Sequence, residues 1–182
     1  NKNLKVDHNF GYVFQTSRLL PWLTVRENIE LVCDEKIEEY KNSIDNLLHD
    51  FKLKDFQNYY PKSISGGMRR KVSLARALVR SPKILLMDEP FVSLDQPTAE
   101  NLYKVLVDYW KKKPLTVILI THNLKEAILL GDRIIFFSKR PASVVYDHKV
   151  KSKRNNLVID DKNIEKEYAL LKKKFPSLLE GL

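Results

Sequence analysis

The chain has 182 residues, of which 43% are hydrophobic and 30% are charged, and this balance excludes an intrinsically disordered protein. No apolar run approaches the ~20 residues needed to cross a bilayer, so the sequence predicts no membrane-spanning segment. The net charge of +9 invites a nucleic-acid function, but the basic runs 111–113, 151–154 and 172–174 contain no aromatic residues for stacking on bases. We therefore expect mostly solvated basic faces, with contact to an anionic membrane surface or a nucleic acid as the alternative.

A strand and a loop open the predicted structure. The segment FGYVFQ (10–15) has the pattern of a strand end, and it runs into the loop TSRLLPWLT (16–24). Pro21 and Trp22 stand at the tip of this loop. The sequence thus predicts an exposed aromatic residue shortly after the first strand.

Helices are predicted to follow the loop. Residues 25–51 place apolar side chains at helical spacing and predict two short helices joined near Cys33. Ser65 is expected to begin a further helix that ends before Pro82. These elements together predict a mainly helical region in the first half of the chain.

Three apolar strands are predicted in the second half: KILLMDEP (83–90), TVILITH (116–122) and RIIFFS (133–138). An amphipathic helix with Pro97 in its first turn lies between the first two strands. Strands that are apolar on both faces and alternate with helices predict an α/β fold with a parallel sheet covered on both sides. A terminal amphipathic helix is expected from about residue 160.

Polar side chains gather where the predicted strands end. Ligands of parallel sheets lie at the carboxyl ends of the strands, which is where Asp88, Glu89 and His122 fall. Two adjacent carboxylates could hold a Mg²⁺ shell and polarise a water, although a polar turn cap is the alternative. Gln15 and His122 could each hydrogen-bond a phosphate or orient a water, whereas a single residue of either type is usually structural.

The segment SISGGMRRK (63–71) predicts an anion site. Ser65 can cap the helix, and Gly66 and Gly67 have no Cβ to keep a ligand away from the backbone N–H groups of the first turn. The positive end of the helix dipole would favour a terminal phosphate there. An ordinary glycine turn before a helix is the alternative, and Arg69 could either contact the phosphate or lie on an exposed helix face.

Five short motifs follow one another along the chain: Gln15, ISGGM (64–68), ILLMDEP (84–90), SLD (93–95) and THN (121–123). In order and spacing they resemble the nucleotide-binding subunit of ATP-binding cassette (ABC) transporters. The resemblance covers most of the chain and weakens after about residue 145. It implies a P-loop NTPase-like α/β fold, with helices on both faces of a parallel sheet and a helical signature subdomain.

The resemblance assigns a role to each motif. It matches Gln15 to the Q-loop glutamine, Ile64–Met68 to the signature motif, and Asp88 and Glu89 to the Walker B acids. It implies ATP and Mg²⁺ as cofactors and ATP hydrolysis as the reaction. On this analogy the catalytic residues are Glu89, His122 and Gln15; the metal residues are Asp88 and Gln15; and the nucleotide-binding residues are Ser65, Gly66, Gly67, Met68 and the D-loop residue Asp95. Met68 departs from the glutamine that the family most often has at its position.

The motifs also divide the chain. They predict a remnant of the catalytic core (1–15), a Q-loop and helical signature subdomain (16–80), a RecA-like core (81–150) and a tail with an amphipathic helix (151–182). The chain contains no G-x-x-x-x-G-K-S/T phosphate loop, which in the family precedes the Q-loop. We therefore expect a subunit that is present here without its phosphate loop and is inactive by itself.

Two further segments resemble importers of the nitrate, sulfonate and taurine group, namely 16–29 and 132–145. The family implies a head-to-tail dimer with a second nucleotide-binding subunit, transmembrane permease subunits and, indirectly, a substrate-binding protein, with no specific nucleic acid. The expected location is the cytoplasmic face of the plasma membrane. Pro21, Trp22 and Leu23 would suit docking to the permease, unless Trp22 only covers the core of its own subdomain. A soluble ABC ATPase and a non-catalytic interaction protein are the competing functions.

Overall fold

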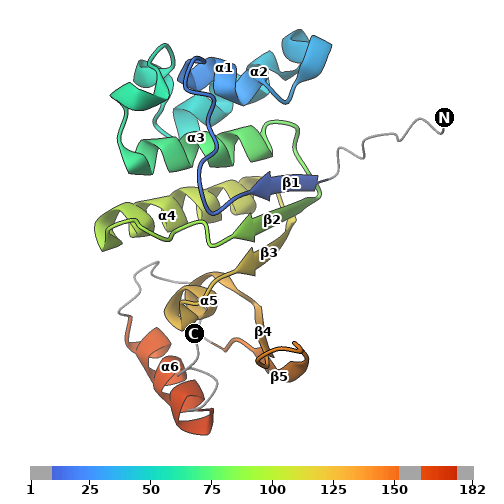
Figure 1. The fold of residues 1–182 in the computed structure, drawn as a ribbon, viewed down its shortest axis with the longest axis vertical. Coiled ribbons are helices and arrows are strands. Elements are labelled where there is room, and N and C mark those ends of the chain that lie inside the picture. The colour runs from blue at the N-terminus through green and yellow to red at the C-terminus, as the bar shows by residue number, and fades with distance from the viewer. Residues whose placement is uncertain (1–9, 152–160, 176–182) are drawn as a thin grey trace, which may run out of the picture. The chain divides into compact units, whose positions relative to one another are not determined.

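The computed structural model describes residues 10–151 and 161–175 (Figure 1). The chain forms two compact units that divide between Ile120 and Thr121. The first unit carries strands β1 to β3 and helices α1 to α4, and the second carries α5, β4, β5 and α6. In the described part of the chain, every helix is too short or too polar to cross a membrane.

The centre of the first unit is a parallel sheet. Strands β1 (Phe10–Val13), β2 (Ile84–Asp88) and β3 (Thr116–Ile120) lie in the order β1-β2-β3, with β2 in the middle. Both pairings are parallel, and Asp88 lies opposite Ile120 in the register. Parallel pairing brings the carboxyl ends of all three strands to the same edge. The predicted α/β fold with a parallel sheet is thus confirmed.

One face of this sheet is closely covered by helix α3. Val13, Leu85 and Met87 on that face are at most 1% exposed. A Cβ added to Gly11 would lie only 2.4 Å from the carbonyl oxygen of Ala77 in α3, so the helix backbone rests directly on β1. Glycine is required at this close approach because any side chain would push the helix away.

The opposite face of the sheet is apolar but exposed within the structure. Its exposed fractions are Phe10 54%, Tyr12 43%, Ile118 51% and Ile120 58%. Parallel sheets are normally buried on both faces. The described residues of the first unit therefore cover one face of the sheet and leave the other face exposed.

The region after the sheet's first strand is helical, as predicted. Helices α1 (Val25–Glu30) and α2 (Ile37–Asp50) are separated by a short 3-10 turn, η1 (Asp34–Lys36), next to the buried Cys33. Thr24 begins α1 with a capping box, because its side chain and that of Glu27 each bond the other's backbone N–H. Two further 3-10 turns follow, η2 (Lys54–Phe56) and η3 (Pro61–Ser63).

Helices α3 (Gly66–Leu78) and α4 (Gln96–Lys112) complete the first unit and run alongside each other in Figure 1. Ser65 is the N-cap of α3, as predicted, and Asp95 is the N-cap of α4. Pro97 lies in the first turn of α4, where its missing N–H costs no hydrogen bond. The sequence signals for both helix starts are therefore confirmed.

The loop 16–24 is held by a buried asparagine. Asn28 is fully buried, and its Oδ1 accepts a hydrogen bond from the backbone N–H of Leu20 at 2.8 Å. Its Nδ2 donates to the carbonyl oxygens of Leu20, Leu23 and Thr24 at 3.1, 3.0 and 2.9 Å. Trp22, at the tip of this loop, is 68% exposed. The alternative that Trp22 covers the core of its own subdomain is therefore wrong.

The second unit contains an antiparallel hairpin and two helices. Its elements are α5 (Leu124–Leu130), β4 (Arg133–Phe137), β5 (Val144–Lys149) and α6 (Lys162–Lys174). Strand β4 pairs antiparallel with β5, so its predicted place as a further parallel strand is wrong. The physical reason is local, because the short connection between them is closed by a bond from Ser138 N to Ser143 O.

The predicted terminal helix is confirmed as α6. Ile164 and Leu171 on its apolar face are buried, and the helix carries Glu167 against the buried His148, with 2.7 Å between Oε1 and Nε2. Glu167 Oε1 also accepts the backbone N–H of Lys151. These bonds fasten α6 to the end of β5 within the second unit.

We predict that Asn28→Ala lowers the free energy of unfolding by about 2–3 kcal/mol, because buried groups of the loop 16–24 lose their partners. Urea denaturation followed by tryptophan fluorescence measures this, since Trp22 and Trp110 both lie in the first unit. The matched control is Asn46→Ala on the exposed face of α2, expected within about 0.5 kcal/mol of the unchanged chain. Equal losses in both variants would contradict the role of Asn28.

Candidate functional site

The site begins at the carboxyl ends of β1 and β2. Gln15 follows the end of β1, and Asp88 and Glu89 stand at the end of β2, its direct neighbour in the sheet. The Nε2 of Gln15 donates a hydrogen bond to Oε2 of Glu89 at 2.8 Å. Residues that are 74 positions apart in the chain thus meet at one edge of the sheet, which is what the sequence predicted for these two.

Glu89 is held in an unusual backbone conformation. Its φ of 42° lies in the left-handed region, where a residue with a Cβ costs roughly 1–2 kcal/mol. Its backbone N–H donates to the carbonyl oxygen of Ile120 at 2.9 Å, which extends the ladder between β2 and β3 by one residue. Such strained residues concentrate at functional sites, where the surrounding structure fixes them. The carboxylate of Glu89 is therefore aimed by the sheet itself.

Two arginines of α3 hold the loop 14–18 by its backbone. The guanidinium of Arg70 is only 6% exposed and donates to the carbonyl oxygens of Phe14, at 2.6 Å, and Gln15. Arg76 donates to the carbonyl oxygens of Ser17 and Arg18, both at 2.9 Å. Burial lowers the pKa of both guanidinium groups below the ordinary arginine value. These charge-assisted bonds fix the backbone from which the Gln15 side chain reaches Glu89.

Sequence reasoning missed these two arginines. The available signal was helical spacing, because Arg70 lies four residues before Leu74 and so belongs to the buried stripe of α3. A cation on a buried stripe needs acceptors, and backbone carbonyls supply them here. Arg69 donates instead to the carbonyl oxygens of Pro61 and Ile64, at 3.2 and 2.7 Å, so its guanidinium holds local backbone. This geometry argues against the phosphate contact considered for Arg69.

The start of α3 carries the predicted anion site. Ser65 is exposed, and its Oγ accepts the backbone N–H of Met68 at 3.2 Å. A Cβ added to Gly66 would meet nothing closer than the Arg69 side chain at 3.8 Å. The chain's own packing therefore does not require glycine at position 66. An open approach to the backbone is what an anion ligand at a helix start would use.

Gly67 has a different reason to be glycine. A Cβ there would lie 2.5 Å from the Cγ2 atom of Thr98 in the first turn of α4. The starts of α3 and α4 are thus packed against each other, which brings Ser65 and Asp95 to the same region. Asp95 accepts the N–H of Thr98 at 3.1 Å, and hydrogen bonds from Thr98 hold the pKa of its carboxyl below the usual range.

His122 belongs to the second unit. It is exposed and stands two residues after the end of β3, between Thr121 and Asn123. Both neighbours organise the start of α5: Asn123 Oδ1 accepts the N–H groups of Lys125 and Glu126, and the hydroxyl of Thr121 donates to Glu126 at 2.7 Å. These bonds hold the backbone on both sides of His122. The contact of His122 with a phosphate stays a prediction.

The chain is similar to proteins of one family. A family model described as "ABC transporter" matches residues 2–92. An aliphatic sulfonates import ATP-binding protein of Bacillus subtilis (strain 168) is 42% identical over 134 residues, covering 74% of this chain and 52% of that protein. A protein of the same description from Bacillus cereus (strain ATCC 10987 / NRS 248) is 40% identical over 164 residues, covering 90% and 63%.

A taurine import ATP-binding protein of Jannaschia sp. (strain CCS1) is 35% identical over 159 residues, covering 86% of this chain and 59% of that protein. The chain thus spans between 52% and 63% of the length of these three relatives.

Solved structures show the same likeness. A dimeric ATP-binding cassette in a post-hydrolysis state, bound to ADP and Pi, superposes with a TM-score of 0.67 at 32% identity, covering 80% of this chain and 64% of that one. A Clostridium perfringens component of an ABC transporter complex gives a TM-score of 0.71 at 23% identity, covering 95% and 68%. The second comparison supports the fold alone.

The two glycines of the α3 start give a matched test. We predict that Gly67→Ala lowers the free energy of unfolding by about 1–3 kcal/mol, because the new methyl group collides with Thr98. Gly66→Ala should leave stability unchanged or raise it by about 0.5 kcal/mol, since both glycines have negative φ. Urea denaturation measures both variants, and Gly67→Ala/Thr98→Ser should regain most of the loss. A Gly66→Ala loss as large as that of Gly67→Ala would contradict this account.

Proposed function

The chain belongs to the ABC transporter family, in its ATP-binding part, and from that premise we propose that it acts in the ATP-hydrolysing nucleotide-binding subunit of an importer. The observation that carries the proposal is the hydrogen bond from Gln15 to Glu89 at the edge of the sheet. It joins the loop that leads to the exposed Trp22 with the carboxylate proposed as the catalytic base. A transport-coupled ATPase needs such a link between its chemistry and its membrane partner.

The proposed reaction is transfer of the γ-phosphoryl group of ATP to water. Glu89 accepts a hydrogen bond from the attacking water and orients it, and Gln15 holds one carboxylate oxygen of Glu89 in place. Mg²⁺ bound with the nucleotide would supply charge neutralisation of the phosphates. Asp88 would hold this ion through water, together with the amide oxygen of Gln15, because Mg²⁺ prefers oxygen ligands and retains several waters. His122 would contact the γ-phosphate.

The start of α3 is proposed to act on a second subunit's nucleotide. Ser65 and the backbone N–H groups after Gly66 would receive the γ-phosphate of ATP held by the partner subunit in a head-to-tail dimer. Asp95, at the adjacent start of α4, would lie at the same interface. The related cassette that carries ADP and Pi is dimeric, which supports a dimer for this chain too.

The phosphate loop is proposed to lie in sequence outside these 182 residues. Two observations support this: the chain contains no G-x-x-x-x-G-K-S/T segment, and it spans 52–63% of the length of its relatives. The exposed apolar face of the sheet, with Phe10, Tyr12, Ile118 and Ile120, would be covered by the segment that carries this loop. Without it, this chain is proposed to bind no ATP and to be inactive.

The loop with Trp22 is proposed to dock against a permease subunit. Trp22 is 68% exposed and Pro21 is also exposed, while Asn28 fixes the loop backbone, so a partner helix would meet a preformed apolar surface. The transported solute is proposed to be a sulfonate or a related small anion, because the relatives are named for aliphatic sulfonate and taurine import. Docking to a permease would place the protein peripherally on the cytoplasmic face of the membrane.

The test measures Mg-ATP binding by calorimetry to this chain and to the protein extended through any phosphate loop encoded upstream. We expect binding only by the extended protein, since the residues proposed here would hold the metal and the water but not the triphosphate. In the extended protein, Glu89→Gln should lower kcat at least 100-fold while ATP still binds, because the water loses its base. The matched control is Glu39→Gln on the exposed side of α2.

Three outcomes would contradict the proposal. Tight ATP binding by the 182-residue chain would show that the nucleotide lies elsewhere. Unchanged turnover in the Glu89→Gln variant would remove Glu89 as the base. Loss of turnover in the Glu39→Gln control as well would show that the effect is not specific to the site.

A further inference from the structure

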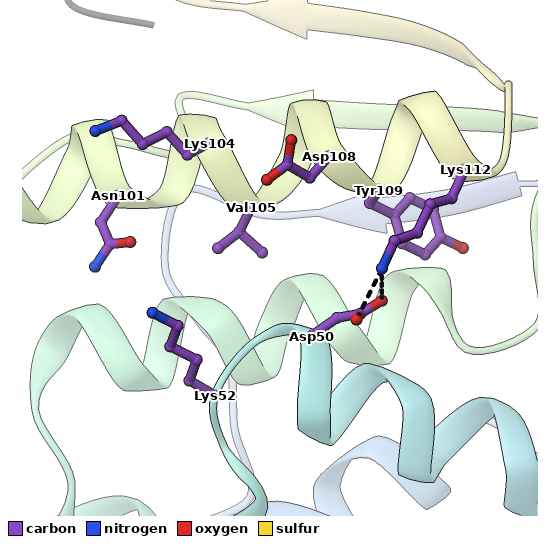
Figure 2. A pocket seen from close by; sticks show the side chains of 8 residues that line it. All are labelled: Asp50, Lys52, Asn101, Lys104, Val105, Asp108, Tyr109 and Lys112. Carbon is purple, nitrogen blue, oxygen red and sulfur yellow. Dashed lines mark hydrogen bonds and ion pairs between the residues drawn. The ribbon is translucent and has the colours of Figure 1, made fainter.

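A hollow on the first unit lies apart from the residues of the proposed ATP site. Its volume is about 300 Å³, and it lies between the end of α2 and the face of α4 that carries Asn101, Lys104, Val105 and Asp108. The residues that line it are Asp50, Lys52, Asn101, Lys104, Val105, Asp108, Tyr109 and Lys112 (Figure 2). Three of the eight are lysines, and both facing elements contribute at least one of them.

Each carboxylate of the hollow forms an ion pair with a lysine other than Lys52 and Lys104. Lys112 Nζ donates to both oxygens of Asp50, at 2.9 and 3.1 Å, and closes one end of the hollow in Figure 2. Asp108 pairs with Lys111 at 3.8 Å. Among the ion pairs within 10–151 and 161–175, none includes Lys52 or Lys104. Lys52 and Lys104 are therefore the two lining lysines outside these ion pairs, and the three lysines of the lining exceed its two aspartates by one charge.

These two lysines lie toward the same end of the hollow. In Figure 2 the side chain of Lys52 points across the gap toward Asn101, and Lys104, on the next turn of α4, extends along the helix toward the same end, so that Asn101 lies between the two amino groups. The lysine amino groups are hydrogen-bond donors only, and the amide nitrogen of Asn101 can donate two further hydrogen bonds. A ligand bound by these three residues must therefore supply hydrogen-bond acceptors. Val105 lines the space between this end and the Lys112–Asp50 pair with apolar surface.

The position of Lys52 is fixed by a conformation that glycine usually occupies. Lys52 follows the end of α2 with a φ of 55°, and the next residue, Leu53, donates its N–H to the carbonyl oxygen of Leu48 at 2.7 Å. This is the left-handed close of a helix, where a side chain is disfavoured. The chain nevertheless places a cation there. The pKa of Lys71 in α3 is lowered, mainly by burial and secondly by the charge of Lys52. Lys71 therefore lies near Lys52.

We propose that this hollow binds a small phosphate-bearing anion, held by the amino groups of Lys52 and Lys104 and by the amide of Asn101. A phosphate group supplies several acceptor oxygens and the negative charge that the two lysines lack. The volume of about 300 Å³ is at the lower end for ligand sites, which fits inorganic phosphate or a short phosphate ester. A ligand that bridges Lys52 and Lys104 would tie the end of α2 to α4. The proposal does not depend on ATP hydrolysis.

The test uses the 182-residue chain, titrated at constant ionic strength with sodium phosphate and, separately, with glycerol 3-phosphate. Binding is followed by amide chemical shifts, with sodium chloride as the screening control. We expect saturable shifts at residues 52, 101, 104 and 105, and at least a tenfold weaker affinity in Lys52→Gln/Lys104→Gln. The control Lys54→Gln, an exposed lysine of η2, should bind as the unchanged chain does. Tighter binding of the ester than of phosphate would identify a metabolite rather than the free ion.

The proposal is overturned if the shifts do not saturate, if chloride reproduces them, or if the double variant binds as well as the control. It is also overturned if the shifts saturate only around 65–68, the start of α3. Urea midpoints of the variants guard against misfolding, and the single variants Lys52→Gln and Lys104→Gln replace the double variant if it unfolds. Each single variant should then weaken binding at least threefold, and unchanged affinity in both would overturn the proposal. Absence of ATP binding by this chain would not affect any of these results.

Discussion

The arrangement of the proposed ATP site depends on one buried cation. Arg70 places its guanidinium between α3 and the chain that leaves β1, and it donates to the carbonyl oxygens of Phe14 and Gln15. A buried charge is tolerated only where it is hydrogen-bonded, and two carbonyl dipoles meet that need. The backbone of Gln15 is thereby fixed to the helix that begins at Ser65. From this backbone the Gln15 amide reaches Glu89, at 2.8 Å.

The sequence predicted the parts of the structure that are encoded locally. Ser65 capping α3, Pro97 in the first turn of α4, and the apolar runs that became β2 and β3 each carry their signal within a few residues. The ordering of the motifs then placed Gln15 and Glu89 at one edge, because parallel strands end on the same side. The correct predictions thus follow from local sequence preferences together with the rule that neighbouring parallel strands end at the same edge of a sheet.

The parts that were missed depend on which segments meet. The pattern of RIIFFS suits a parallel strand as well as an antiparallel one. The short connection from β4 to β5 decides that β4 pairs antiparallel with β5. Gly66 and Gly67 look equivalent in the sequence, but only Gly67 faces Thr98, about 30 residues further along. Arg70 and Arg69 are likewise neighbours, yet one holds the loop after β1 and the other holds local backbone. Adjacent residues on a helix point in different directions, so a motif alone cannot separate their roles.

Helix α3 connects these observations. Its first turn packs on α4 through Gly67 and Thr98, its middle holds the backbone of Phe14 and Gln15, and its far half rests on β1 where Gly11 has no side chain. A rotation of α3 would therefore strain all three contacts together. A ligand or partner that shifts the start of α3 would also act on the Gln15 carbonyl, which Arg70 of the same helix holds. Because Gln15 donates to Glu89, a shift of α3 would reach the Glu89 carboxylate through the backbone of Gln15, with no change required in the strands.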